Sequence, residues 1–462
     1  MRRNSNNTSA WCCSLKSLLV ALLLLSVTVP LSAQEDLSLR QAVDLALRSS
    51  PLLAVADAGE REAEARIQLA RSGYMPHASF SERYERSNSP VFVFTSLLTQ
   101  QRFTERNFDI NALNHPDAIS NYQSRLVVEQ VLFDARKTSR VVQAARFSRQ
   151  WASEDSRRSR ADVVFQVLQT YFGVALAQKN LEVAHQTVES AQADLNRATS
   201  IYQSGRSTQA DVLALRVHVA AMLEQQIGAS NDLDVARATL NDALGVSLDR
   251  SFNLTTPLES TVTAPESSLG NHRHLTAENR AEMRQAEIAR LIAHTQQQSE
   301  QSAYWPEVVV QGAIESDRQN LFHNGNAYWS TGVTVRWSLW NGGETRARVQ
   351  QARAAEARAM ALRDHADSRI DLELRKAFLN LQAAAQRVVV ASAASDEAAE
   401  VHRIVQDRHQ AGLTTVTELL RSETALAAAR TRYLEAVYDQ RIAAAALDHA
   451  AGMLSSDSAL VN

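Results

Sequence analysis

The sequence contains an internal duplication, in which equivalent residues lie a constant 207 positions apart. Leu132-Phe133-Asp134 matches Leu339-Trp340-Asn341 at this offset. The same offset relates further positions along the chain: Ala145-Arg146 and Ala352-Arg353, Tyr171 and Phe378, Gly205 and Gly412, Asp211 and Glu418, and Gly245 and Gly452. Because chance matches do not keep one register all the way from Leu132 to Gly245, the chain is predicted to contain two copies of one structural unit.

The first copy carries an insertion. Tyr74-Met75-Pro76 matches Tyr304-Trp305-Pro306 at an offset of 230, which is larger than the offset of 207 found further along the chain. The extra residues therefore lie between Pro76 and Phe133. The polar, aromatic stretch from Phe92 to Asn121 is the expected insert.

Each copy is predicted to contain a first helix, two strands and two long antiparallel helices. The first helices are expected at residues 38–72 and 277–303, the second at 136–203 and 344–410, and the third at 208–244 and 414–451. The second and third helices are rich in alanine and lack proline, which favours long helices. A helix over 136–203 would be about 100 Å long at ~1.5 Å per residue. Glycine commonly follows the end of a helix, so the hairpins are expected to turn at Gly205 and Gly412.

The helices show the spacing of a coiled coil. Apolar and small residues alternate at steps of three and four, which averages 3.5 residues and predicts a left-handed supercoil. The positions are Val164, Val167, Tyr171, Val174, Gln178, Leu181, His185 and Val188, and also Leu426, Ala429, Tyr433, Ala436, Gln440, Ala443 and Leu447.

Four segments show a period of two instead, which predicts strands with one apolar and one polar face. These strands are expected at residues 77–91, 121–133, 307–316 and 327–340. In the last of them Trp329, Val333 and Val335 alternate with Ser330, Thr334 and Arg336. An apolar outer face with aromatic residues at the strand ends is typical of a membrane β-barrel. A half-buried sheet in a soluble protein is the alternative for the strands taken alone.

Four strands are too few to close a membrane barrel, because the smallest have about 8. An open edge in lipid leaves unpaired backbone groups. Several chains must therefore share one barrel. Two chains would give about 8 strands with an interior filled by side chains, and three would give about 12 and an aqueous lumen.

Residues 1–33 have the features of an export signal. Arg2, Arg3 and Lys16 precede an apolar segment, and Leu31-Ser32-Ala33 resembles a cleavage site. The only two cysteines, Cys12 and Cys13, lie in this leader, which excludes disulfides and thiolate sites from the rest of the chain. The chain has 48 basic and 51 acidic residues without a basic block, so nucleic-acid binding is not expected.

These features together resemble the TolC-like outer-membrane efflux ducts, or outer membrane factors. The resemblance rests on the duplicated plan, on Leu339-Trp340-Asn341-Gly342-Gly343 after the last strand, and on the glycine tips. It implies an α+β membrane protein: a homotrimer with a shared 12-stranded barrel in outer-membrane lipid and a periplasmic tunnel of helical hairpins. It also implies a passive, gated exit duct for efflux or type I secretion. Its partners would be a periplasmic adaptor and an inner-membrane transporter of the RND, ABC or MFS type.

The resemblance also assigns candidate site residues. Gly205, Arg206, Gly412 and Leu413 fall on the family's tip turns and are expected to contact the adaptor. Asp211 and Glu418 fall on positions that often form acidic rings in the tunnel. Two more residues stand nearby and are candidates for the gate: Arg421, which could pair with Glu418, and His409. Asn341-Gly342-Gly343 is expected to form the turn from the barrel to the helix.

Other chemistry is not expected. The sequence lacks the motifs HExxH, GxSxG and GxGxxG and a phosphate loop, so we predict neither an enzyme nor a cofactor. His272 and His274 lie close together in a polar linker and are not expected to bind metal. A periplasmic coiled-coil adaptor or scaffold without a pore is the alternative function, and a hydrolase or metal enzyme is a second rival. The expected organisation is a leader (1–33), a first repeat (34–247), a linker (248–276), a second repeat (277–452) and a tail (453–462).

Overall fold

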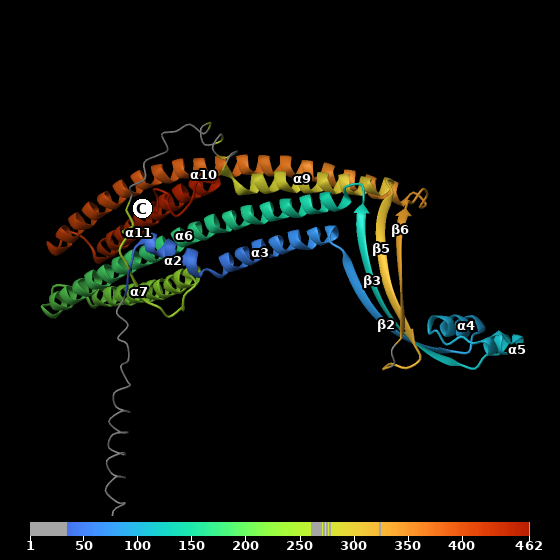
Figure 1. Cartoon of the computed structure of the whole chain (residues 1–462). Coiled ribbons are helices and arrows are strands. Elements are labelled where there is room, and N and C mark those ends of the chain that lie inside the picture. The colour runs from blue at the N-terminus through green and yellow to red at the C-terminus, as the bar shows by residue number, and fades with distance from the viewer. Residues whose placement is uncertain are drawn as a thin grey trace, which may run out of the picture.

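The computed structural model describes residues 35–259, 270, 273, 276, 279–322 and 325–461. The predicted leader, most of the second half of the linker, and the pair His272 and His274 lie outside the described residues. The chain is elongated, with a layer of long helices that continues at one end into a four-stranded sheet (Figure 1). None of the helices in the described ranges has both the length and the apolar character needed to cross a membrane.

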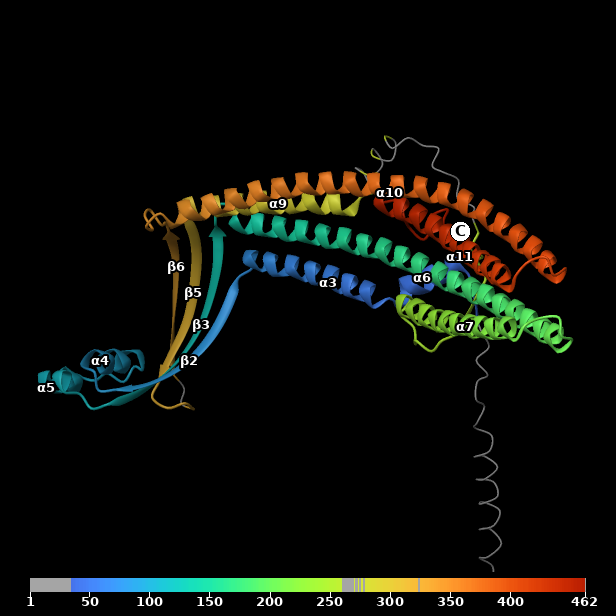
Figure 2. The same ribbon diagram turned by 180° about the vertical axis from the view of Figure 1, so that it is seen from behind.

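Two helical hairpins form most of the layer. The first consists of α6 (Lys137–Gln203) and α7 (Gln209–Leu244), and the second of α10 (Glu344–Gln410) and α11 (Val416–Ala450). α6 and α10 each have 67 residues. The shorter helices α3 (Pro51–Arg71) and α9 (Ala281–Gln301) lie along the ends of α6 and α10 nearer the sheet, as both views show (Figures 1 and 2). The predicted long antiparallel hairpins are therefore present.

The prediction of one helix over residues 38–72 is wrong. The structure has α2 (Leu39–Ser49) and α3, separated at Ser50, whose ψ of 125° is extended. The residue before a proline is disfavoured in helical conformation, and Pro51 follows directly. Pro51 then occupies the first turn of α3, where its missing N–H removes no hydrogen bond.

The main hydrophobic core lies where α2 packs against α6 and α7. Val43, Leu168 and Leu244 are fully buried there. A small parallel ribbon of β1 (Glu35–Leu37) and β4 (Phe252–Leu254), which was not predicted from the sequence, covers this core. Leu454 and Val461 from the tail are also buried in it. The connections between the repeats thus add to the core at the middle of the helical layer.

Tyr171 joins α6 to this ribbon. Its buried hydroxyl donates to the carbonyl of Leu37 at 2.8 Å and accepts from the N–H of Thr256 at 3.0 Å. Tyr171→Phe leaves both backbone groups without a partner, so we expect a loss of about 1–3 kcal/mol of stability. Thermal unfolding in detergent measures this loss. Tyr202→Phe, at an exposed tyrosine, is the control, and an equal effect of both would contradict the role of the hydroxyl.

The four-stranded sheet is antiparallel throughout. Its strands are β2 (His77–Ser87), β3 (Ile119–Phe133), β5 (Glu307–Arg318) and β6 (Asn326–Arg336), in that spatial order. Register places these apolar side chains on one face: Phe80, Leu126, Ile314 and Trp329. The next row, on the opposite face, is polar: Ser81, Arg125, Glu315 and Tyr328. Phe80 and Trp329 are 68% and 75% exposed, so none of the described residues covers the apolar face.

Several predicted strand ends are wrong. Residues 88–91 are not part of β2, because Pro90 begins a helix and Ser89 before it is extended. β6 ends at Arg336, which pairs with Glu307, the first residue of β5; beyond it the strand has no partner. The Trp337 indole N–H instead donates to the carbonyl of Tyr304 at 3.2 Å. β3 begins two residues earlier than expected, and β5 ends two residues later.

Candidate functional site

The two hairpin tips have the same backbone geometry. Gly205 and Gly412 both have φ of +74°, which is left-handed and favours glycine. The N–H of Arg206 donates to the carbonyl of Ile201 at 3.1 Å, and that of Leu413 donates to Arg408 at 2.8 Å. These are the bonds of a Schellman motif, which ends a helix with its carbonyls satisfied. All four predicted tip residues are exposed. Their contact with an adaptor stays a prediction.

Asp211 and Glu418 both lie in the first turn of the returning helix. Asp211 accepts from the hydroxyl of Thr208 at 2.8 Å and from that of Ser207 at 3.1 Å. The hydrogen bond from the Thr208 side chain, with further bonds from the Thr208 N–H and Ser207, lowers the pKa of Asp211 below its usual range. These residues form a capping box, so Asp211 supports the tip whether or not it also lines a lumen.

Glu418 occupies the equivalent place in the second tip. Its carboxylate accepts from the Thr414 hydroxyl at 2.7 Å, and it makes no ion pair with Arg421 within the described part of the chain. The Glu418–Arg421 ion pair considered from the sequence is therefore not formed, and Glu418 instead accepts the hydrogen bond from Thr414 across the turn. His409 also closes this turn, because its Nδ1 lies 3.3 Å from the carbonyl oxygen of Thr414. Glu418 and Arg421 are both exposed.

A buried polar cluster behind the tips was not found from the sequence. It takes one residue from each long helix, about 15 Å from the turns at ~1.5 Å per residue: Asp194 (α6), His218 (α7), His402 (α10) and Glu423 (α11). His218 Nε2 lies 3.0 Å from a carboxylate oxygen of Glu423, and this contact joins the two hairpins. His402 Nδ1 lies 3.1 Å from the hydroxyl of Ser422.

The cluster holds two carboxylates away from water. Asp194 and Glu423 are only 4% and 3% exposed. Asp194 Oδ2 and Glu423 Oε1 have no hydrogen-bond partner among the described residues. Burial, together with the nearby charge of Glu423, raises the pKa of Asp194, while Arg197, His402 and His409 oppose the rise. Asp194 therefore takes up a proton more readily than an exposed aspartate does.

The turn from the sheet to the long helix differs between the copies. In the second copy Gly342 and Gly343 have φ of +66° and +85°, and Asn341 donates to the Thr345 hydroxyl at 2.9 Å. In the first copy the left-handed positions are Ala135 and Arg136. There the Asp134 carboxylate accepts from the N–H of Thr138 at 2.7 Å. The predicted turn at Asn341-Gly342-Gly343 thus directs the chain into α10.

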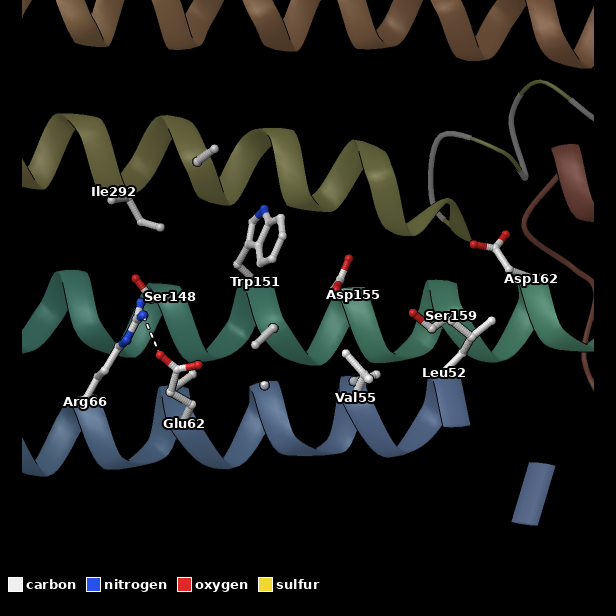
Figure 3. Close-up of a pocket in the computed structure, with 15 residues that line it drawn as sticks. Leu52, Val55, Glu62, Arg66, Ser148, Trp151, Asp155, Ser159, Asp162 and Ile292 are labelled. Carbon is white, nitrogen blue, oxygen red and sulfur yellow. Dashed lines mark hydrogen bonds and ion pairs between the residues drawn. The ribbon is translucent and has the colours of Figure 1, made fainter. Parts of the chain in front are cut away.

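A groove of about 650 Å³ lies between α3, α6 and α9. Figure 3 shows Trp151 and Ile292 on its sides, with Leu52 and Val55 from α3. Its charged residues already have partners: Arg66 pairs with Glu62 at 2.6 Å, Asp155 accepts from Gln285, and Asp162 lies 2.8 Å from His449. In the described ranges, no three His, Cys, Asp or Glu side chains converge as metal ligands.

Comparison with known proteins decides the family. A family model described as outer membrane efflux protein matches residues 42–246 and 273–453. This chain belongs to the outer membrane efflux protein family. The two matched segments cover both predicted repeats and leave out most of the linker. The interpretation as an outer-membrane exit duct of the TolC-like family is thereby confirmed, and a pore-free coiled-coil scaffold is not supported.

Individual members of the efflux protein family align over most of the chain. The alkaline protease secretion protein AprF of Pseudomonas aeruginosa is 24% identical over 426 residues, or 90% of this chain and 85% of AprF. Protein CyaE of Bordetella pertussis is 25% identical over 432 residues, or 92% and 86%. The crystal structure of CusC superposes with a TM-score of 0.77 at 16% identity, covering 91% of this chain and 93% of CusC. The last comparison shows a shared fold.

Proposed function

We propose that three copies of this chain, each without its leader of residues 1–33, form one exit duct across the outer membrane. Their sheets would close into a barrel of 12 strands, with β2 of one copy paired to β6 of the next. The observation that supports this most is the sheet itself. It has one uncovered apolar face, one polar face and an edge strand at each side that is paired only within its own chain.

The energetics of lipid favour closure. An unpaired N–H or C=O in the hydrocarbon layer costs several kcal/mol, and each edge strand presents a row of them. Closing the barrel between copies removes both edges. The apolar groove between α3, α6 and α9 would at the same time receive a neighbouring copy along the helical wall. The hairpins, about 100 Å long, would then form a periplasmic tunnel.

The partners follow from the position of the tips at the far end of this tunnel. We propose that Gly205, Arg206, Gly412 and Leu413 contact a periplasmic adaptor, which links the duct to an inner-membrane transporter of the RND, ABC or MFS type. The transporter would supply the energy. Relatives named for protease secretion and for efflux support both export classes equally. We assign this chain no catalytic step.

Channel activity tests the proposal directly. Protein purified from outer membranes is expected to form ion-conducting pores in planar lipid bilayers, and the pores should be blocked by a fragment of the adaptor or change conductance when it binds. Folded, correctly assembled protein that never conducts would contradict a duct.

Glu418 provides a narrower test. Carboxylates repeated around a threefold axis concentrate cations at a mouth, so Glu418→Gln is expected to lower the preference for cations by about twofold or more. Reversal potentials in a salt gradient measure this preference. Glu189→Gln removes an exposed carboxylate further along α6 and is the matched control. An unchanged reversal potential would contradict the placement of Glu418 in the lumen.

A further inference from the structure

The insert of the first repeat is a helical unit at the outer end of the sheet. Residues 88–118 connect β2 to β3 and contain α4 (Pro90–Thr99), η2 (Glu105–Phe108) and α5 (Ile110–Asn114). α4 and α5 lie at the end of the strands away from the long helices in both views (Figures 1 and 2). The matching connection of the second repeat spans only residues 319–325. The insert expected from the sequence as a polar, aromatic stretch is therefore a helical unit.

A buried polar network fixes this unit to the sheet. Gln100, which follows α4, is 5% exposed. Its side-chain amide donates to Asn121 Oδ1 at 2.9 Å and to the carbonyl of Ser120 at 3.0 Å. The backbone carbonyl of Gln100 accepts from Asn326 Nδ2 at 3.1 Å. The side-chain amide of Asn121 in turn donates to the Asp317 carboxylate. The network reaches β3, β5 and β6 and so specifies one position for α4.

The side of the sheet on which α4 lies follows from the register. Asn121, Asp317 and Asn326 belong to the polar face, opposite Phe80 and Trp329. A cavity of about 240 Å³ separates α4 from this face. It is lined by Phe92, Thr95, Ser96 and Thr99 of the helix and by strand residues that include Arg83, Glu85, Glu315 and Tyr328. In the proposed barrel this face points to the lumen, so α4 lies on the enclosed side.

The surface of α4 away from the sheet is apolar. Val91, Phe94 and Leu98 stand at positions i, i+3 and i+7 and are exposed, whereas Val93 and Ser96 are buried against the rest of the chain. The Phe94 ring packs edge-on against Phe103, with 4.9 Å between the ring centroids, and Phe103 packs against Phe108 with 5.0 Å between theirs. We call Val91, Phe94 and Leu98 the α4 stripe. A helix with an exposed apolar stripe at this spacing is suited to packing against another helix.

We propose that the α4 stripes of the three copies pack against one another on the threefold axis and plug the outer mouth of the duct. This inference rests on the proposed trimer, and the partner is a second and third copy of this chain. The dimensions place this contact at the mouth. Three helices of about 10 Å diameter span about 22 Å, which is close to the backbone diameter of about 24 Å enclosed by 12 strands about 4.8 Å apart and tilted by ~40°. The bundle therefore covers the rim of the barrel rather than entering between its inward side chains.

The plug would close the duct at the end opposite the hairpin tips. An apolar constriction excludes water and ions until something displaces it, which is how hydrophobic gates act in channels. Each helix remains tied to its own strands through Gln100 while the three stripes separate. The duct thus carries a closure at each end, and the outer one opens when cargo passes.

Cysteine cross-linking tests the contact, because the chain after Ser14 has no cysteine. Val91→Cys or Leu98→Cys is expected to give disulfide-linked pairs of chains when intact outer membranes are oxidised, since the Cα atoms must approach within about 7 Å. Phe80→Cys is the control, because Phe80 is exposed to an extent between Val91 and Leu98 but lies on the opposite face of the sheet, and it should give none. Absence of cross-links from both stripe positions would overturn the plug.

Conductance gives an independent readout. Val91→Ser combined with Leu98→Ser is expected to lower the fraction of time in the closed state about tenfold. Ile110→Ser, on α5 and as exposed as Val91, is the matched control and should leave it unchanged. If trimers of the stripe variant conduct in the same way as wild-type trimers, the proposed plug is wrong and the proposed duct still holds. A protein that is not trimeric in native mass spectrometry would reject both.

Discussion

Gly412→Pro is expected to weaken capture of the adaptor at least about tenfold while the trimer stays assembled. Proline fixes φ near −65°, whereas Gly412 needs +74°, and it also removes the N–H that donates to His409 at 2.9 Å. The Schellman turn therefore cannot form, and Leu413 is moved away from its position. A change of only ~1.4 kcal/mol in binding weakens the complex tenfold, so we expect at least about a tenfold loss of affinity.

The measurement is the affinity of purified trimers for the purified adaptor. Gly412→Ala is the matched control, because a Cβ at this position meets no atom within 4 Å and only the left-handed strain of roughly 1–2 kcal/mol remains. Its loss should be clearly smaller. Leu413→Asp tests the exposed side chain without changing the backbone. Wild-type affinity in Gly412→Pro would place the adaptor contact elsewhere.

Mild acid is expected to tighten the two hairpins of each chain against each other. The folded state raises the pKa of Asp194 above its unfolded value, so folding favours the protonated form. The penalty of the buried charge is therefore present above the raised pKa and is relieved as the pH falls through it toward the ordinary carboxyl range near 4.

Hydrogen exchange of the amides in α6 and α11 measures this effect. Wild-type protein should become several-fold more protected as the pH is lowered, after correction for the intrinsic exchange rate. Asp194→Asn combined with Glu423→Gln removes both carboxylates and should flatten the response and raise protection at neutral pH. Asp232→Asn, at an exposed site on α7, is the control. Asp211, whose lowered pKa protects its cap until stronger acid, does not interfere. Equal pH responses in wild type and double variant would contradict the assignment.

The hairpins and strands were accessible to sequence reasoning because their patterns are long. Val164, Val167, Tyr171 and Val174, placed on one helical seam by their spacing, are all buried in the main core. The glycines at 205 and 412 mark turns because no other residue type adopts their backbone conformation as readily. Alternation along the length of a strand likewise separates its apolar face from its polar face.

Short or dispersed features were missed for physical reasons. β1 and β4 have three residues each, too few to show a period of two. α4 was taken as loop because the insert was treated as one polar stretch, although Pro90 followed by an apolar run is a helix start. The buried cluster of Asp194, His218, His402 and Glu423 takes one residue from each of four helices, so no local sequence pattern predicts it. Only the register between the hairpins brings these side chains together.

The central claim is that three chains share one barrel in the outer membrane. Native mass spectrometry of the protein extracted from isolated outer membranes tests this most directly. The expected result is a complex of three chains, each lacking the leader of residues 1–33. A monomer or dimer recovered from the soluble periplasmic fraction, and absent from the outer membrane, would contradict the shared barrel and the duct built on it.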